Sequence, residues 1–113
     1  MRRVDVLSRY AVLLCVVLAA HAGRVAAMTD VEAMELGYKV AAVKMAIQEP
    51  AAPGAMHAIT SLGHDQRYYV MVRGWLTYQL QGDRSLLEAS PDQTKVRARV
   101  DFLQRAIRAI DLE

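Results

Sequence analysis

The sequence has few residues that form cross-links or break helices. It holds a single cysteine, Cys15, and only three prolines in 113 residues. One cysteine cannot form a disulfide within the chain, which excludes the class of small secreted domains that disulfides hold together. Because Cys15 lies within residues 1–27, the chain after residue 27 offers no thiolate nucleophile and no cysteine ligand for a metal. A domain this small without disulfides must be stabilised by a hydrophobic core or by a partner.

Sequence motifs that carry chemistry are also missing. We find no G-x-S-x-G, no glycine-rich phosphate loop and no H-E-x-x-H pair. His57 and His64 are the two histidines after residue 27. On one continuous helix they would lie about 10 Å apart, which is too far to share a metal ion. We therefore expect a protein that is not an enzyme and that has no cofactor.

The formal net charge of +2 comes from the N-terminus. Residues 1–27 contain four arginines and one acidic residue, whereas residues 28–113 contain ten basic and eleven acidic residues. Nucleic-acid-binding proteins need a clustered basic surface. We therefore expect no nucleic-acid partner for this chain.

Residues 1–27 have the order of features that is typical of a secretory signal peptide. A methionine and two arginines come first, Tyr10–Ala20 is an unbroken apolar run, and small-residue motifs end at Ala22 and Ala27. A bilayer span needs about 20 apolar residues, and His21 ends this run well before that length. We predict cleavage after Ala27, with cleavage after Ala22 as the alternative.

Such a leader predicts the compartment and the domain organisation. We expect the protein to be exported, to the periplasm or outside the cell, with no stable membrane span after processing. Residues 28–113 are then a single helical domain.

The beginning of this domain has the pattern of an amphipathic helix. Thr29 and Glu32 have the spacing of a capping box, and Pro50 and Pro53 follow the last periodic residue. Two adjoining apolar stripes make a wide face, which predicts a helix that contacts more than one neighbour. One stripe is Val31, Met34, Tyr38, Ala41 and Met45, and the other is Leu36, Val40, Val43 and Ile47.

The middle of the domain predicts a short helical segment, 55–62, and a central helix, 66–81, whose wide apolar arc indicates packing on most sides. Gly63 suits the position just after a helix, and Gln81-Gly82-Asp83 suits a break. A β-hairpin made of 68–72 and 75–80 remains the alternative to the central helix. Together these patterns predict an all-α fold, a small bundle of three to four helices.

The last helix is expected to begin with Ser90 as N-cap and Pro91 in its first turn. Its apolar residues recur at spacings of four and three, as in a coiled coil: Val96, Val100, Leu103, Ile107 and Ile110. We favour packing of this seam within the chain, because the wide arc of the central helix needs a long partner. A homodimer through the same residues is the alternative.

The candidate binding residues are aromatic. Tyrosine and tryptophan prefer interfaces and pocket rims, because each needs a polar partner when it is buried. The group comprises Tyr68, Tyr69, Trp75 and Tyr78, with His64 in the preceding turn. A core role for the same rings is the competing interpretation. We therefore predict a non-enzymatic exported protein that binds a protein partner, as an inhibitor, immunity protein, chaperone or adaptor does.

The alternative function is a periplasmic carrier of a small apolar ligand or of a soft metal ion such as Cu(I). Thioether and imidazole groups are ligands that Cu(I) accepts, and Met56 lies next to His57. Methionines also fill gaps in helical cores, which is the competing explanation for Met56.

Overall fold

A computed structural model of the chain describes residues 28–112. These residues form four helices and no strand: α2 (Asp30–Gln48), α3 (Ala55–Gly63), α4 (Tyr69–Ala89) and α5 (Thr94–Asp111). The predicted all-α fold is confirmed. The β-hairpin alternative is wrong, because α4 continues through Arg73 and Gly74 without a turn.

The predicted signal peptide, with its two cleavage sites, lies outside the described residues. The chain divides into two compact units, and the boundary between them falls after Ala33, inside α2. The second unit, from Met34 onward, contains the rest of α2 and the three helices after it. In the part of the chain that the structure describes, no helix is both long and apolar enough to cross a bilayer.

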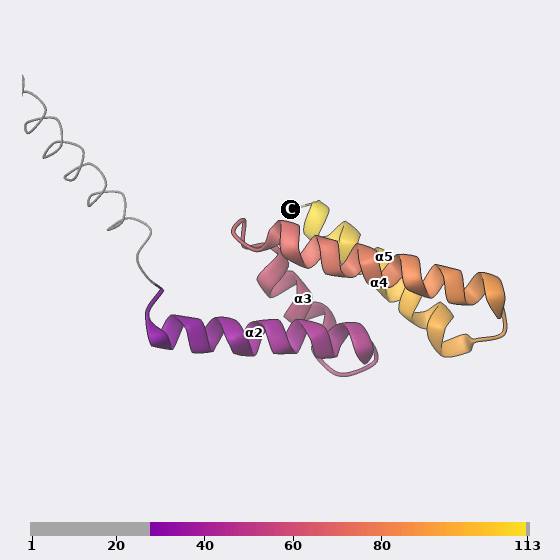
Figure 1. Cartoon of the computed structure of the whole chain (residues 1–113), viewed down its shortest axis with the longest axis horizontal. Helices are drawn as coiled ribbons and strands as arrows, with labels where there is room; N and C mark the ends of the chain where they lie inside the picture. The colour runs from indigo at the N-terminus through magenta and orange to yellow at the C-terminus, as the bar shows by residue number, and fades with distance from the viewer. Residues whose placement is uncertain (1–27, 113) are drawn as a thin grey trace, which may run out of the picture. The chain divides into compact units, whose positions relative to one another are not determined.

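Helices α4 and α5 form an antiparallel pair, and α3 packs against both of them (Figure 1). The core between these helices and the C-terminal half of α2 is aliphatic with one aromatic ring. Its most deeply buried side chains are Val43, Ile59, Leu62, Val72, Leu76 and Leu103, and Phe102 and Ile110 lie beside them. Burial of these side chains is the main favourable contribution to the stability of the fold.

The seam of the last helix lies inside this core. Val96, Val100, Leu103 and Ile110 are buried, and Ile107 is half-buried against the same cluster. The structure therefore agrees with packing inside one chain. A homodimer through this seam would require the core to open, because these side chains already contact their own chain.

The break predicted at Gln81-Gly82-Asp83 is wrong, since α4 runs unbroken to Ala89. Gly82 lies on the exposed side of the helix, where a glycine costs only about 1 kcal/mol relative to alanine. Asp83 faces the core side and is buried in an ion pair with α5. Both residues are thus compatible with a continuous helix.

The helix starts are predicted with mixed success. The capping box is confirmed: the Glu32 amide donates to Thr29 Oγ1 at 3.2 Å, and the Thr29 amide donates to Glu32 Oε2 at 3.3 Å. Ser90 is instead the C-cap of α4, and α5 begins later, at Thr94, after Gln93. The predicted start at Ser90 is wrong because its amide donates to the Leu86 carbonyl and so completes α4.

The two stripes on α2 differ in burial. Val43 and Ile47 of the second stripe are buried, whereas Met34, Tyr38 and Met45 of the first are 60%, 71% and 67% exposed. These residues lie on opposite faces of the helix. The expectation of two adjoining stripes on one wide face is therefore wrong, because only the second stripe packs against the core.

Gly63 is predicted just after a helix, and this prediction is wrong. It is the last residue of α3 and is buried, with neighbours in α5 and α4 close to the position of its missing Cβ. A Cβ atom there would lie 2.6 Å from Cγ2 and 3.3 Å from Cβ of Ile110. The absence of a side chain therefore lets α3 approach α5 closely.

We expect Gly63→Ala to lower the free energy of unfolding by about 1–3 kcal/mol, the usual cost of overpacking a core. The β-branched Ile110 is stiff at χ1 and buried, so it cannot turn away freely. Urea denaturation followed by circular dichroism measures the change. Gly82→Ala is the matched control, because nothing lies within 4 Å of its added Cβ. That control should gain about 0.5–1 kcal/mol. An equal gain for both variants would contradict the close approach at Gly63.

Candidate functional site

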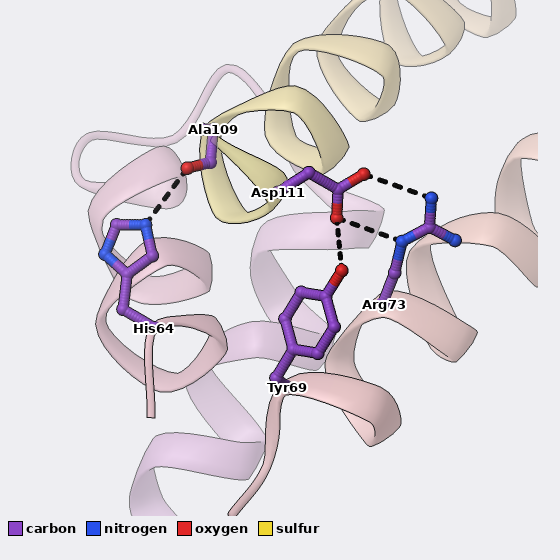
Figure 2. Close-up of polar contacts among 5 residues, drawn as sticks. All are labelled: His64, Tyr69, Arg73, Ala109 and Asp111. Atoms are coloured by element: carbon purple, nitrogen blue, oxygen red, sulfur yellow. Dashed lines mark hydrogen bonds and ion pairs between the residues drawn. The ribbon is translucent and has the colours of Figure 1, made fainter. Parts of the chain in front are cut away.

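A polar cluster joins the start of α4 to the end of α5 (Figure 2). The Tyr69 hydroxyl donates to Asp111 Oδ1 at 2.6 Å. Arg73 donates from Nε to Oδ1 and from Nη2 to Oδ2, both at 3.0 Å. The carboxylate of Asp111 therefore accepts three hydrogen bonds from side chains of α4. This geometry fixes the end of α5 against α4.

The pKa values in this cluster move away from neutrality. Hydrogen bonds from Arg73, and then from Tyr69, lower the pKa of Asp111. The bond to Asp111 raises the pKa of Tyr69 and also that of Arg73. A general acid or base works best when its pKa lies near the operating pH. These shifts hold each group in its ordinary protonation state, so the arrangement is suited to structure rather than to proton transfer.

His64 also serves this end of the molecule. Its Nε2–H group donates to the carbonyl oxygen of Ala109 at 3.0 Å, so the ring ties the turn after α3 to the last turn of α5 (Figure 2). This bond satisfies a carbonyl near a helix C-terminus, where carbonyls lack partners within the helix. The sequence predicts His64 as a binding residue, and the structure places its ring in this contact with α5.

The structure divides the predicted aromatic group. Tyr68 and Trp75 are half-buried and pack against the core, with the Arg67 guanidinium 5.1 Å from the Tyr68 ring centroid and Lys44 Nζ 5.8 Å from that of Trp75. Tyr69 is half-buried and bonded to Asp111. Tyr78 is 80% exposed. Tyr69 and Tyr78 line one hollow, and neither Tyr68 nor Trp75 is part of its lining.

This hollow lies on the outward side of α4, and we call it the α4 hollow. It is lined by Tyr69, Val70, Arg73, Gly74, Thr77, Tyr78 and Gln81. Two of these side chains are apolar or aromatic and largely exposed, Val70 at 78% and Tyr78 at 80%. Gly74 lies between them, four residues from each, and apart from its chain neighbours and the nearby backbone of α4, no heavy atom is within 4 Å of the position of its missing Cβ.

A second hollow, the α4–α5 hollow, lies where the two helices meet. It measures about 410 Å³ and is lined by Leu80, Arg84, Gln104, Ile107 and Arg108. Leu80 is buried and Ile107 half-buried, and both belong to the edge of the core. Two guanidinium groups and one amide therefore surround an apolar floor.

The residues predicted for a soft metal do not come together. Met56 is half-buried against the core, whereas the next residue, His57, is exposed on α3. Successive residues on a helix point about 100° apart. Within residues 28–112, no three histidine, cysteine, aspartate or glutamate side chains gather closely enough to hold a metal ion.

The most deeply buried polar group, Asp83, is absent from the residues that the sequence singles out. Asp83 on α4 accepts hydrogen bonds from Arg99 Nε and Nη2 on α5, each at 2.6 Å, and from Gln79 Nε2 at 3.1 Å. The bond to Asp83 raises the pKa of Arg99. A carboxylate at a helical core position is a signal that could have found it, but the expected break at Gly82 places Asp83 in a turn.

Comparison with known proteins finds no relative. No protein-family model matches the chain, and neither the curated proteins nor the solved structures include a match. A function must therefore be inferred from the side chains of the two hollows and of the polar clusters.

Proposed function

We propose that the chain is an exported, non-enzymatic helical protein that binds a protein partner through the α4 hollow. The observation that carries this proposal is the pair of exposed side chains Val70 and Tyr78 on either side of Gly74. Exposed apolar side chains around a concavity are typical of surfaces that contact another protein. Tyrosine is also among the residues that contribute most binding energy at such surfaces.

The shape of this surface indicates what the partner presents. Gly74 leaves a notch in the middle of α4, and a glycine in an exposed helix interior is unfavourable by about 1 kcal/mol relative to alanine. A partner whose apolar side chain enters the notch would compensate for that cost. Thr77 and Gln81 at the border can form hydrogen bonds with the partner backbone. We therefore propose an apolar anchor side chain with a polar border, the usual anatomy of a protein interface.

The polar clusters support the non-enzymatic part of the proposal. Tyr69 and Arg73 are both bonded to Asp111, and the pKa of each of the three groups is shifted away from neutrality. Asp83 and Arg99 are similarly saturated by each other. Neither cluster leaves a nucleophile beside a base, the arrangement that covalent catalysis needs.

The test compares two truncations on the same helix. Tyr78→Ala removes the exposed ring from the α4 hollow, whereas Leu86→Ala removes a side chain that is 46% exposed and does not line it. We expect Tyr78→Ala to reduce capture of the partner from the exported fraction about tenfold or more, as the loss of a central interface residue does. Leu86→Ala should capture as the wild type does. Quantitative cross-linking with mass spectrometry measures both.

A third variant tests the notch. Gly74→Gln fills it with a side chain whose Cβ meets no other heavy atom in the free protein. We expect this variant to fold at least as stably as the wild type and to lose the same partner as Tyr78→Ala. Equal capture by all three variants and the wild type would refute binding through the α4 hollow.

A further inference from the structure

The arginine side chains of the described residues differ in whether they contact a partner within the chain. Seven lie in the described residues, and five of them have an intramolecular partner. Arg67, Arg73 and Arg99 form ion pairs with Asp65, Asp111 and Asp83. Arg97 donates to the Pro91 carbonyl, and Arg105 lies 5.9 Å from the ring centroid of Phe102. Arg84 and Arg108 are the exceptions: within residues 28–112 their guanidinium groups form no hydrogen bond or ion pair.

Both exceptions line the same open depression, the α4–α5 hollow. Arg84 comes from α4 and Arg108 from α5, so the antiparallel packing of these helices brings together two cations that are far apart in sequence. Both side chains are exposed, so solvent weakens the repulsion between them, and an anion bound between them would remove the rest. Neither arginine forms an ion pair with an acid of the described residues, and Asp111 is already bonded to Arg73 and Tyr69.

The remaining lining residues define the rest of the ligand. Leu80 and Ile107 provide an apolar floor, and the Gln104 amide can donate a further hydrogen bond. The hollow is open to solvent and measures about 410 Å³. Guanidinium groups recognise carboxylates through paired hydrogen bonds of fixed geometry. An anion with no apolar part would leave the floor unused, and an apolar molecule with no charge would leave both arginines unused.

We propose that the α4–α5 hollow binds an aliphatic carboxylate, with the carboxylate on Arg84 and Arg108 and the hydrocarbon chain over Leu80 and Ile107. This site is separate from the notch at Gly74, and it does not use the aromatic residues predicted from the sequence. The proposal does not depend on a protein partner.

Octanoate is the probe that tests this site. We expect a titration followed by NMR to shift the Ile107 methyl signals and the side-chain Nε–H signals of Arg84 and Arg108. Octanol and octylammonium have the same chain without the carboxylate, and we expect each to bind at least about tenfold more weakly, the factor for losing a hydrogen bond between charged groups.

Variants of single arginines show which groups hold the carboxylate. Arg84→Gln and Arg108→Gln should each weaken octanoate binding about tenfold. Both side chains are exposed and bonded to nothing among the described residues, so neither change should affect folding. Arg105→Gln is the matched control on α5, because Arg105 does not line the hollow, and it should bind octanoate like the wild type.

Three outcomes would overturn the proposal. Equal binding of octanol would mean apolar partitioning only, and an equal loss in Arg105→Gln would mean non-specific attraction to a basic protein. No binding of octanoate, together with binding of a glutamate-rich peptide in the same hollow, would assign the two arginines to an acidic protein segment. Tyr78 does not line the α4–α5 hollow, so Tyr78→Ala should not change octanoate binding, whether or not the proposed protein partner exists.

Discussion

Asp83→Ala is expected to destabilise the domain by about 3–5 kcal/mol, the cost of removing one partner from a buried ion pair. The side chain of Asp83 is 1% exposed and that of Arg99 is 24% exposed. The substitution leaves the guanidinium without its two charge-assisted hydrogen bonds and leaves the Gln79 amide without an acceptor. A domain of this size has a free energy of unfolding of about 5–15 kcal/mol. Thermal and urea unfolding should therefore show that a large part of this stability is lost.

The large cost of removing Asp83 alone differs from the net contribution of the ion pair to the stability of the domain. Two charges that are taken out of water lose hydration, and their attraction only partly compensates for that loss. Replacing both by apolar residues can therefore be nearly neutral. We expect Asp83→Leu combined with Arg99→Met to recover most of the lost stability, whereas Arg99→Met alone should be as damaging as Asp83→Ala.

Two results would contradict this interpretation of the ion pair. If Asp83→Ala melted like the wild type, the ion pair would be exposed to solvent and not part of the core. If the double variant were as unstable as the single ones, the pair would contribute a net stabilisation that no apolar replacement supplies. Arg73→Met, at a pair that is 43% and 29% exposed, is the matched comparison and should cost much less.

The fold could be predicted from the sequence because its information is local and periodic. The seam from Val96 to Ile110 and the capping box at Thr29 each depend on residues within a few turns of one helix. The predictions at Gly63 and Gly82 are wrong because the roles of these residues depend on contacts with distant parts of the chain. Gly63 is needed because Ile110 lies against it, and Gly82 is tolerated because the helix around it is held by tertiary packing.

The candidate sites are harder to predict from the sequence, because they too depend on contacts between residues that are far apart in the chain. The periodicity placed Tyr68, Tyr69, Trp75 and Tyr78 on one helix, but the neighbours of α4 decide which rings are covered. The contacts of Asp111 with Tyr69 and Arg73 join residues about 40 positions apart. Such pairs depend on the angle and register of α4 against α5, which a single sequence does not specify. The same holds for Arg84 and Arg108, whose meeting in one hollow needs the antiparallel register.

Leu103→Glu is the substitution with the largest expected effect, since it places a charge in the middle of the core. Leu103 is fully buried among the aliphatic side chains of the main cluster. An ionised carboxylate without partners in such surroundings is disfavoured by more than the whole stability of a small domain. We expect the variant to be unfolded at neutral pH at every protein concentration, with loss of its far-UV circular dichroism. Ala98→Glu, on the exposed side of the same helix, should remain folded.

The concentration series distinguishes packing within one chain from packing between two. If the seam joined two copies, Leu103→Glu would separate them and leave a soluble monomer that keeps most of its helix. The wild type would then be a dimer by light scattering, and its melting temperature would rise with concentration by mass action. The burial of Val96, Val100 and Ile110 against α4 and the rest of the chain leads us to expect neither result. A helical Leu103→Glu monomer beside a dimeric wild type would show that this core is completed only between two chains.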